Sequence, residues 1–365
     1  MNPGERFDAI MSYRKPDRMP VWFFGYWAET LELWNTSGLN GRQADEYFGM
    51  DTDWENGMWN WHGICRIEAH GDQSLCRIIE ETDSYVIEQD SLGGIARRLK
   101  DSESIKECIK PPVEPNRESW NSFRKLLDAD DPWRFPDGWQ ERARKVQAEP
   151  RVKTMMGGSL FGYPRNWFGL EAWSLLAYDD PALYEEIIAW QAEYFMKMAE
   201  RVLPFFKPDF VYLFEDCCGS NGPLYSPAAH RQFYHKYYVR MVEFYKSRGV
   251  KYVLLDSDGK VDPLIPCWLD AGVDIIFPIE IGTWNADPME LRRRFGRSLR
   301  MMGGFDKHLI RQGRETVRRE LTRILPLVEE GGFIPMPDHR IPPDVSIAQF
   351  RDYLEVFQSV YGYVQ

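Results

Sequence analysis

The second half of the sequence alternates between short apolar runs and longer amphipathic stretches, and this alternation constrains the fold more than any other feature. The apolar runs end abruptly in glycine or in acidic residues, as buried strands do. They lie at residues 153–156, 210–214, 252–255, 273–279, 300–302 and 333–335. Because strands that alternate with helices and have no antiparallel return form a parallel sheet, we expect an α/β fold. With two further strands near Pro20 and Asp51, the pattern predicts a (β/α)8 TIM barrel.

Three of the expected helices begin with one signal, a capping residue followed by proline at the first helical position. The pairs are Asp180-Pro181, Ser226-Pro227 and Asp287-Pro288. The first of these helices is expected to run to about Leu203, because apolar residues form a single stripe along it.

The first 150 residues are less regular than the rest. An aromatic-rich extension runs from Trp22 to Trp61, and residues 78–99 alternate as the strands of a hairpin do, with Gly93-Gly94 near the turn. The polypeptide is therefore expected to form one barrel domain over residues 1–365, with a small antiparallel hairpin addition within a less regular part at about 56–150.

Composition and charge exclude several classes of protein. Of the 365 residues 44% are hydrophobic, which is ample for the core of one barrel, and the net charge of -11 opposes binding to nucleic acid or to an anionic membrane surface. Charged residues interrupt every apolar run near the N-terminus, so no signal peptide and no membrane span are expected. The six cysteines form no CxxC pair and there is no HExxH motif. We therefore expect a cytoplasmic protein with reduced thiols and without a zinc-binding signature.

Acidic residues and one histidine stand where the predicted strands end. Because the active sites of TIM barrels lie at the carboxyl ends of the strands, these side chains are expected to face one mouth. They are Glu215, Asp216, Asp256, Asp258, Glu280, Asp306, Asp338 and His339.

The run KYVLLDSDGK places two of these carboxylates, Asp256 and Asp258, at the end of one strand. On an extended chain residues two apart project to the same side, and carboxylates held close raise each other's pKa unless a cation or a proton lies between them. The run therefore indicates a metal site or an acid/base pair. The alternative is that Asp258 caps a helix beginning near Val261.

Aromatic residues provide candidates for a substrate pocket. Those of the N-terminal extension, among them Trp22, Phe24, Tyr26 and Trp27, are either core residues or an aromatic wall around an apolar or cationic ligand. Tyr163 follows a glycine-rich strand end and is either a ligand contact or a packing residue.

Several segments of the sequence resemble the uroporphyrinogen decarboxylase superfamily. They are ERFDAIMSYRKPDRMPV, GSNGPLYSPAAHRQF, LLDSDGKVDPLIPCWLDAGVDIIFPIE, GGFDK and GGFIPMPDHRIPPDVS. The resemblance implies a (β/α)8 barrel that either decarboxylates porphyrinogens or transfers methyl groups to a corrinoid protein or to a thiol such as coenzyme M. In the methyltransferases a His-x-Cys pair and a later cysteine bind zinc. The matching positions here are Asp256, Asp258 and His339.

These departures from the superfamily pattern change the expected chemistry. Two carboxylates and an imidazole favour Mg²⁺, Mn²⁺, Fe²⁺ or an oxygen-rich Zn²⁺ site over the zinc site that activates a thiol, so coenzyme M is not the expected acceptor. The stretch FFGYWAETLELWNTSG contains no arginine, whereas the decarboxylases carry arginines there that bind the carboxylates of the tetrapyrrole.

The resemblance and the residues together predict a methyltransferase-like enzyme. It would demethylate a small O- or N-methylated substrate and pass the methyl group to a corrinoid carried by a partner protein. The predicted metal ligands are Asp256, Asp258 and His339, and the predicted catalytic residues are Glu215, Asp216, Glu280 and His339. Two alternatives stay open, a lyase that decarboxylates a small acid or a porphyrinogen and a non-catalytic ligand-binding barrel. Whether the protein forms a homodimer also stays open.

Overall fold

A six-stranded parallel sheet forms the centre of the protein. The computed structural model describes residues 1–41, 43–51, 54–55, 57–100 and 106–362. The order of the strands across the sheet is β12-β11-β10-β9-β6-β5. Their bounds are Thr154–Gly158 for β5, Phe210–Phe214 for β6, Tyr252–Asp256 for β9, Ile275–Ile279 for β10, Arg300–Phe305 for β11 and Phe333–Pro337 for β12. All six lie where the apolar runs predict strands, which confirms the parallel α/β architecture.

The gap between β12 and β5 is closed by two segments of the N-terminal part. Tyr26 forms a parallel bridge with Ile341, just beyond β12. The N–H of Asp51 donates to the carbonyl of Val21 at 3.3 Å, and the N–H of Met156 in β5 donates to the carbonyl of Met58 at 3.4 Å. These contacts complete a (β/α)8 TIM barrel in which, among the described residues, six positions are regular strands.

The prediction of a strand near Pro20 is therefore wrong, because residues 20–25 form no regular ladder. Gly25 has a φ of 87°, which interrupts the extended backbone that a ladder requires. The strand predicted near Asp51 falls partly outside the described residues, since residues 52–53 and 56 are not among them.

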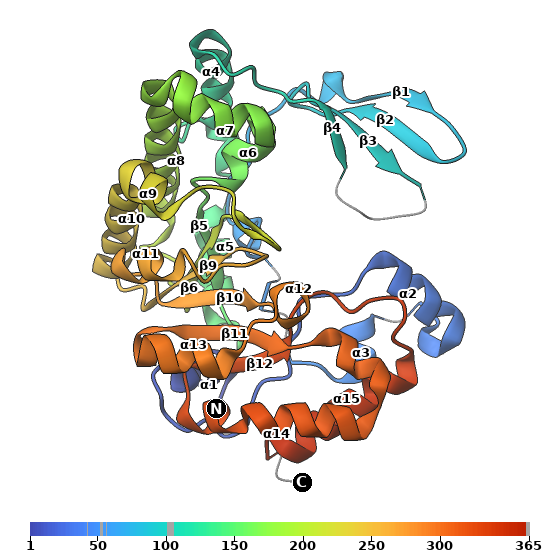
Figure 1. Cartoon of the computed structure of the whole chain (residues 1–365). Coiled ribbons are helices and arrows are strands. Elements are labelled where there is room, and N and C mark those ends of the chain that lie inside the picture. Colours follow the sequence, from blue (N-terminus) through green and yellow to red (C-terminus); the bar gives the residue numbers. More distant parts are fainter. Residues whose placement is uncertain (42, 52–53, 56, 101–105, 363–365) are drawn as a thin grey trace.

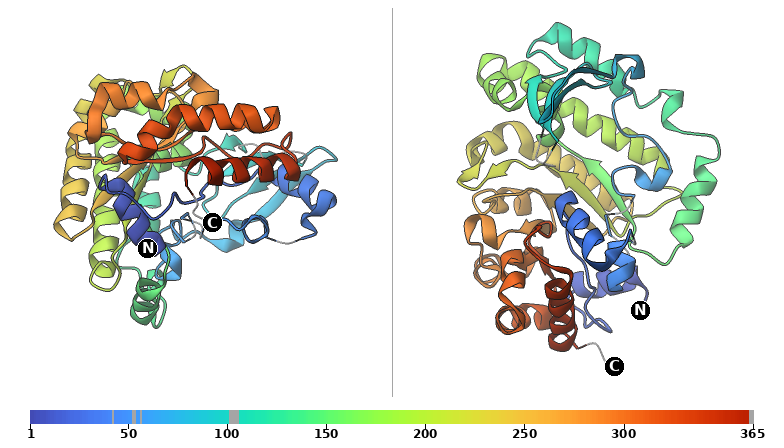
Figure 2. Two further views of the ribbon diagram at one scale, coloured as in Figure 1. Left: turned by 90° about the horizontal axis from the view of Figure 1, so that it is seen from below. Right: turned by 90° about the vertical axis from the view of Figure 1, so that its right-hand side faces the viewer.

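Helices surround the parallel sheet (Figures 1 and 2). The longest helices are α8 (Pro181–Val202), α10 (His235–Ser247), α14 (Arg314–Glu330) and α15 (Ile347–Val360). The shorter helices are α1 (Pro3–Met11), α2 (Ala28–Trp34), α3 (Ala44–Phe48), α4 (Arg117–Phe123), α5 (Trp139–Ala148), α6 (Gly162–Phe168), α7 (Leu170–Asp179), α9 (Pro227–Ala229), α11 (Ile265–Asp270), α12 (Ile281–Trp284) and α13 (Pro288–Phe295). Among the helices described, none is both long enough and apolar enough to cross a membrane.

The three predicted helix starts are confirmed by their capping hydrogen bonds. The side chain of Asp180 accepts from the N–H of Leu183, and the other two cap residues act in the same way at the starts of α9 and α13. By contrast, Asp258 does not cap a helix near Val261, because α11 begins only at Ile265.

The predicted hairpin is part of a four-stranded antiparallel sheet, here called the accessory sheet. It consists of β1 (Arg77–Glu81), β2 (Tyr85–Gln89), β3 (Ile95–Leu99) and β4 (Glu107–Lys110), in that order. Figure 1 shows it projecting beside α4 and α7, and in the right-hand view of Figure 2 it lies at the opposite end of the molecule from α14 and α15. A second, very short pair, β7 (Cys218–Gly219) and β8 (Gly222–Pro223), follows β6.

Aromatic side chains of the N-terminal extension fill the barrel interior. The ring of Trp54 lies 6.1 Å from Phe210 in β6 and 5.0 Å from Phe277 in β10, measured between centroids. Trp22 packs against Trp54 at 6.2 Å and against Phe7 of α1 at 6.1 Å. These rings form an apolar core below the strand ends, and several acidic side chains lie where the strands stop.

Candidate metal centre at the barrel mouth

Three side chains converge where strands of the barrel end, and we call them the Asp258 group. Asp258 follows β9, Glu280 follows β10 and His339 follows β12. Each offers one ligand atom, and these atoms lie within 4.8 Å of one another. Asp258 Oδ2 is 3.5 Å from His339 Nε2, too far for a strong direct hydrogen bond. Two carboxylates and one imidazole so arranged can hold a divalent cation.

The loop that carries Asp258 is fixed by its neighbours. The N–H of Ser257 donates to the carbonyl of Phe277 at 2.9 Å, and its hydroxyl donates to the carbonyl of Asp258 at 3.1 Å. Gly259 has a φ of 83°, and a Cβ there would lie 2.6 Å from the carbonyl oxygen of Cys218, so the position requires glycine. The carboxylate itself is not fixed in this way. Its Oδ1 is buried and has no hydrogen-bond partner in the described part of the chain.

Glu280 is buried and held in a single orientation. Its Oε2 accepts from the N–H of Gly259 at 2.6 Å, and its Oε1 accepts from the hydroxyl of Thr283 at 3.0 Å. Burial raises the pKa of Glu280, and the negative charge of Asp258 raises it further. A cation between the two carboxylates would reverse the second effect.

His339 is positioned by aromatic rings and by the residue before it. Its imidazole stacks on Trp27 at 5.7 Å and meets the edge of Phe24 at 5.0 Å. The buried carboxylate of Asp338 accepts N–H groups from residues 281, 282 and 307, which ties the end of β12 to the loops after β10 and β11. The histidine is therefore presented from a rigid support, as a metal ligand requires.

Asp256 lies close to the Asp258 group but not within it. Its carboxylate accepts a hydrogen bond from the hydroxyl of Tyr212 in β6. Burial raises the pKa of Asp256 well above its ordinary value, and the charge of Asp258 adds to the effect. Of the three residues predicted as metal ligands, the structure thus brings together Asp258 and His339, and it adds Glu280 as the third member.

Glu215 and Asp216 directly follow β6 and make contacts outside the Asp258 group. The carboxylate of Glu215 is buried and accepts N–H groups of residues 160, 161 and 162, the start of α6. Burial raises its pKa to about 7, although those N–H groups favour the charged form. Asp216 binds Arg165 at 2.7 Å. Both carboxylates already have protein partners.

The predicted pocket residues divide between four places. Phe24 and Trp27 contact His339 and so lie at the Asp258 group. Trp22 is in the barrel core, and Tyr26 packs between Trp34 and Phe350 of α15. Tyr163 lines a separate cavity between α6, α8 and the accessory sheet.

Sequence reasoning did not single out Tyr212 or Thr283. Tyr212 is the polar member of an otherwise apolar strand, and that exception is the signal that marks it. Thr283 stands three residues after Glu280 on a helical turn, a spacing that allows its hydroxyl to reach back.

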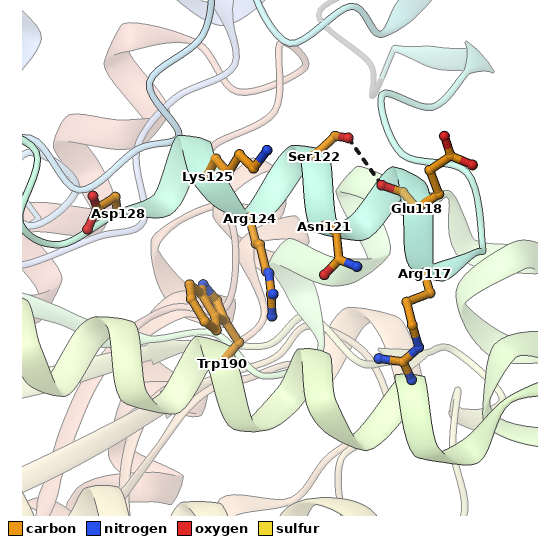
Figure 3. A pocket seen from close by; sticks show the side chains of 8 residues that line it. All are labelled: Arg117, Glu118, Asn121, Ser122, Arg124, Lys125, Asp128 and Trp190. Atoms are coloured by element: carbon orange, nitrogen blue, oxygen red, sulfur yellow. Dashed lines mark hydrogen bonds between the residues drawn. The ribbon is translucent and has the colours of Figure 1, made fainter.

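A wide surface hollow of about 870 Å³ lies between α4 and α8, and residues other than those of the Asp258 group line it (Figure 3). Arg117 and Arg124 from its rim both bind Glu186 of α8, and Arg124 also lies 5.0 Å from the ring of Trp190. Both arginines of the hollow are thus paired with the same glutamate.

The fold and the polar strand ends together define an α/β barrel of the kind that carries its site at the carboxyl ends of the strands. The sequence profile of the family "Uroporphyrinogen decarboxylase (URO-D)" matches residues 166–360, more than half of the chain. The protein belongs to the uroporphyrinogen decarboxylase family. None of the curated proteins compared matches the sequence.

Solved structures share the fold at low sequence identity. A methyltransferase from Methanosarcina mazei superposes with a TM-score of 0.59 and 13% identity, over 98% of this chain and 99% of that one. A B12-independent methionine synthase from Shewanella sp. W3-18-1, in complex with selenomethionine, gives a TM-score of 0.47 and 12% identity, over 94% and 96%. At 13% identity, the similarity to the Methanosarcina mazei methyltransferase establishes the fold alone.

Proposed function

We propose that the protein is a methyltransferase-like enzyme. It removes the methyl group of a small O- or N-methylated substrate and passes it to a corrinoid carried by a partner protein. The observation that supports this proposal is the convergence of Asp258, Glu280 and His339 at the barrel mouth, where Asp258 Oδ1 lacks a protein partner among the described residues.

The donor set fits a divalent cation. Oxygen and imidazole ligands suit Mg²⁺, Mn²⁺, Fe²⁺ and oxygen-rich Zn²⁺ sites, and a buried carboxylate oxygen without a partner is costly unless a cation or water satisfies it. When bound, such a cation supplies Lewis-acid stabilisation to the oxygen or nitrogen from which the methyl group leaves.

The surrounding side chains orient the members of the Asp258 group. Trp27 and Phe24 fix the ring of His339, and Gly259 and Thr283 fix the carboxylate of Glu280. The rings also present an apolar face beside the polar group, which suits a small substrate with a methyl group at its reacting end.

A second candidate function is the decarboxylation of a small acid, and one side chain favours it. Arg340 follows His339 directly, and its guanidinium lies 5.2 Å from the ring of Trp27. A substrate carboxylate placed over Trp27 would meet this positive charge.

Methyl transfer to free corrinoid separates the two candidates. Metal-supplemented protein is incubated anaerobically with cob(I)alamin and a panel of aryl methyl ethers and methylamines, and methylcobalamin is followed by its absorbance. We expect turnover with at least one donor and a loss of more than about 100-fold in Asp258→Asn, because a direct ligand is removed.

The matched control is Asp274→Asn, at the opposite end of β10, where the carboxylate accepts from Val253 and activity should be unchanged. Release of CO₂ from a small acid without any methyl transfer would establish the decarboxylase instead.

A further inference from the structure

A second cavity, of about 250 Å³, lies between the accessory sheet and helices α6 and α8, and we call it the Gln191 cavity. Its walls include the rings of Tyr163, Trp167 and Phe195. Ser91 and Leu92, from the turn between β2 and β3, close it on the side of the accessory sheet. No member of the Asp258 group lines it.

Gln191 gives this cavity a polar wall that no contact among the described residues explains. The residue is completely buried in α8, and within the described ranges neither its Oε1 nor its Nε2 has a hydrogen-bond partner. Each buried polar group left without a partner costs about 1 to 3 kcal/mol. Gln191 also stands one helical turn after Ile187, at a position that the apolar stripe of α8 would assign to a hydrophobic residue. An apolar side chain there would avoid the cost, so the buried amide, which lacks a partner within the described ranges, favours a bound molecule that supplies one.

Two other polar groups of the cavity are engaged or stand at its rim. The hydroxyl of Tyr194 donates to the carbonyl of Ile67 at 2.8 Å. Glu68 is exposed. Water molecules inside would need two to four polar partners each, and the mostly aromatic and aliphatic walls offer few. The cavity therefore suits a neutral, largely apolar molecule that satisfies one amide.

We propose that the Gln191 cavity binds a single flat ring bearing a cyclic amide or a carboxamide. A glutamine amide presents one acceptor and one donor side by side, and the matching edge is an N–H beside a C=O on the ligand. Flat rings pack well against aromatic walls, and a cavity of this size, below the range typical of drug-sized ligands, holds about one ring. This inference concerns a site separate from the Asp258 group and does not rest on methyl transfer.

Binding of small probes tests the proposal. The probes 2-pyridone and benzamide carry the amide edge, and toluene is the apolar control; binding is measured by titration calorimetry and by saturation-transfer NMR. We expect the native protein to bind an amide probe saturably. In Gln191→Leu amide binding should weaken by at least about 10-fold, or about 1.4 kcal/mol, while toluene binding persists.

Two further variants complete the test. Leu92→Trp fills the cavity from the accessory sheet and should abolish binding of all probes without altering α8. Gln140→Leu, on the exposed surface of α5, is the matched control and should bind as the native protein does. Absence of saturable amide binding to the native protein, or equal binding by Leu92→Trp, would overturn the proposal. Unchanged affinity of Gln191→Leu for the amide probes would likewise contradict the assignment of amide recognition to Gln191.

Discussion

Two carboxylates at neighbouring strand ends, Glu215 after β6 and Asp258 after β9, differ in what surrounds them. Glu215 is completely buried and accepts N–H groups from three consecutive residues at the start of α6. Asp258 is partly exposed, its side chain retaining 38% of its accessible surface, and its Oδ1 has no partner in the parts of the chain described. Position at a barrel mouth does not distinguish them, whereas hydrogen bonding does.

The difference indicates which carboxylate is available to a ligand. Glu215 accepts hydrogen bonds from the protein's own backbone, since those three N–H groups would otherwise be unsatisfied at a helix start. Asp258 instead shares a small volume with Glu280 and His339, and its charge raises the pKa of Glu280. We infer that Glu215 stabilises the fold and that Asp258 serves the site.

The largest expected effect is on stability, from Glu215→Ala. The substitution removes the acceptor of three buried N–H groups and leaves a void, so we expect the free energy of unfolding to fall by about 3 kcal/mol or more at pH 6, measured by urea denaturation. The control is Glu193→Ala, which breaks the exposed pair with Arg240 and should cost under about 1 kcal/mol. A comparable small loss in both variants would contradict the structural role of Glu215.

The pH dependence of that loss is the next largest effect. Because burial raises the pKa of Glu215 to about 7, its contribution to stability is fully present below its unfolded pKa and is lost as the pH rises through about 7. The cost of Glu215→Ala should therefore be greater at pH 5 than at pH 8, by on the order of 2 kcal/mol. Denaturation curves of both proteins at the two pH values measure it. A cost that grows with pH would show the opposite shift.

The smallest effect is expected from Asp256→Asn. Burial already raises the pKa of Asp256 well above its ordinary value, and an asparagine oxygen can still accept from the hydroxyl of Tyr212. Stability at pH 6 should change by less than about 1 kcal/mol, and any response of the protein to a cation should persist. Loss of the cation response in this variant would place Asp256 among the ligands after all.

Most of the barrel could be predicted because its signals are local. The apolar runs that became β6, β9 and β12 end in acidic residues, and the helix starts carry a cap followed by proline. The segment at Pro20 has the same apolar character, but the positive φ of Gly25 interrupts its extended backbone. Tyr26 therefore forms an isolated bridge instead of a ladder. Composition cannot distinguish such a segment from a strand.

The site could be predicted only in part because side-chain direction depends on distant residues. The sequence places Asp256, Asp258 and Glu280 at strand ends, but Tyr212, 44 residues before Asp256, accounts for the hydrogen bond that the Asp256 carboxylate accepts. Likewise, the N–H groups that donate to Glu215 come from three residues 53 to 55 positions earlier. No local pattern records these partners.

The most direct test of the account is the effect of cations on the melting temperature of chelator-treated protein. A cation bound only by the folded protein raises stability by about RT ln(1 + [L]/Kd), so Mn²⁺, Mg²⁺, Fe²⁺ or Zn²⁺ should raise the melting temperature in a concentration-dependent way. Asp258→Asn should fold, be at least as stable without cation because a like charge is removed, and lose the response, while Asp274→Asn keeps it. An unchanged melting temperature of the native protein with all four cations, or an equal response in Asp258→Asn, would contradict the assignment of a metal centre to the Asp258 group.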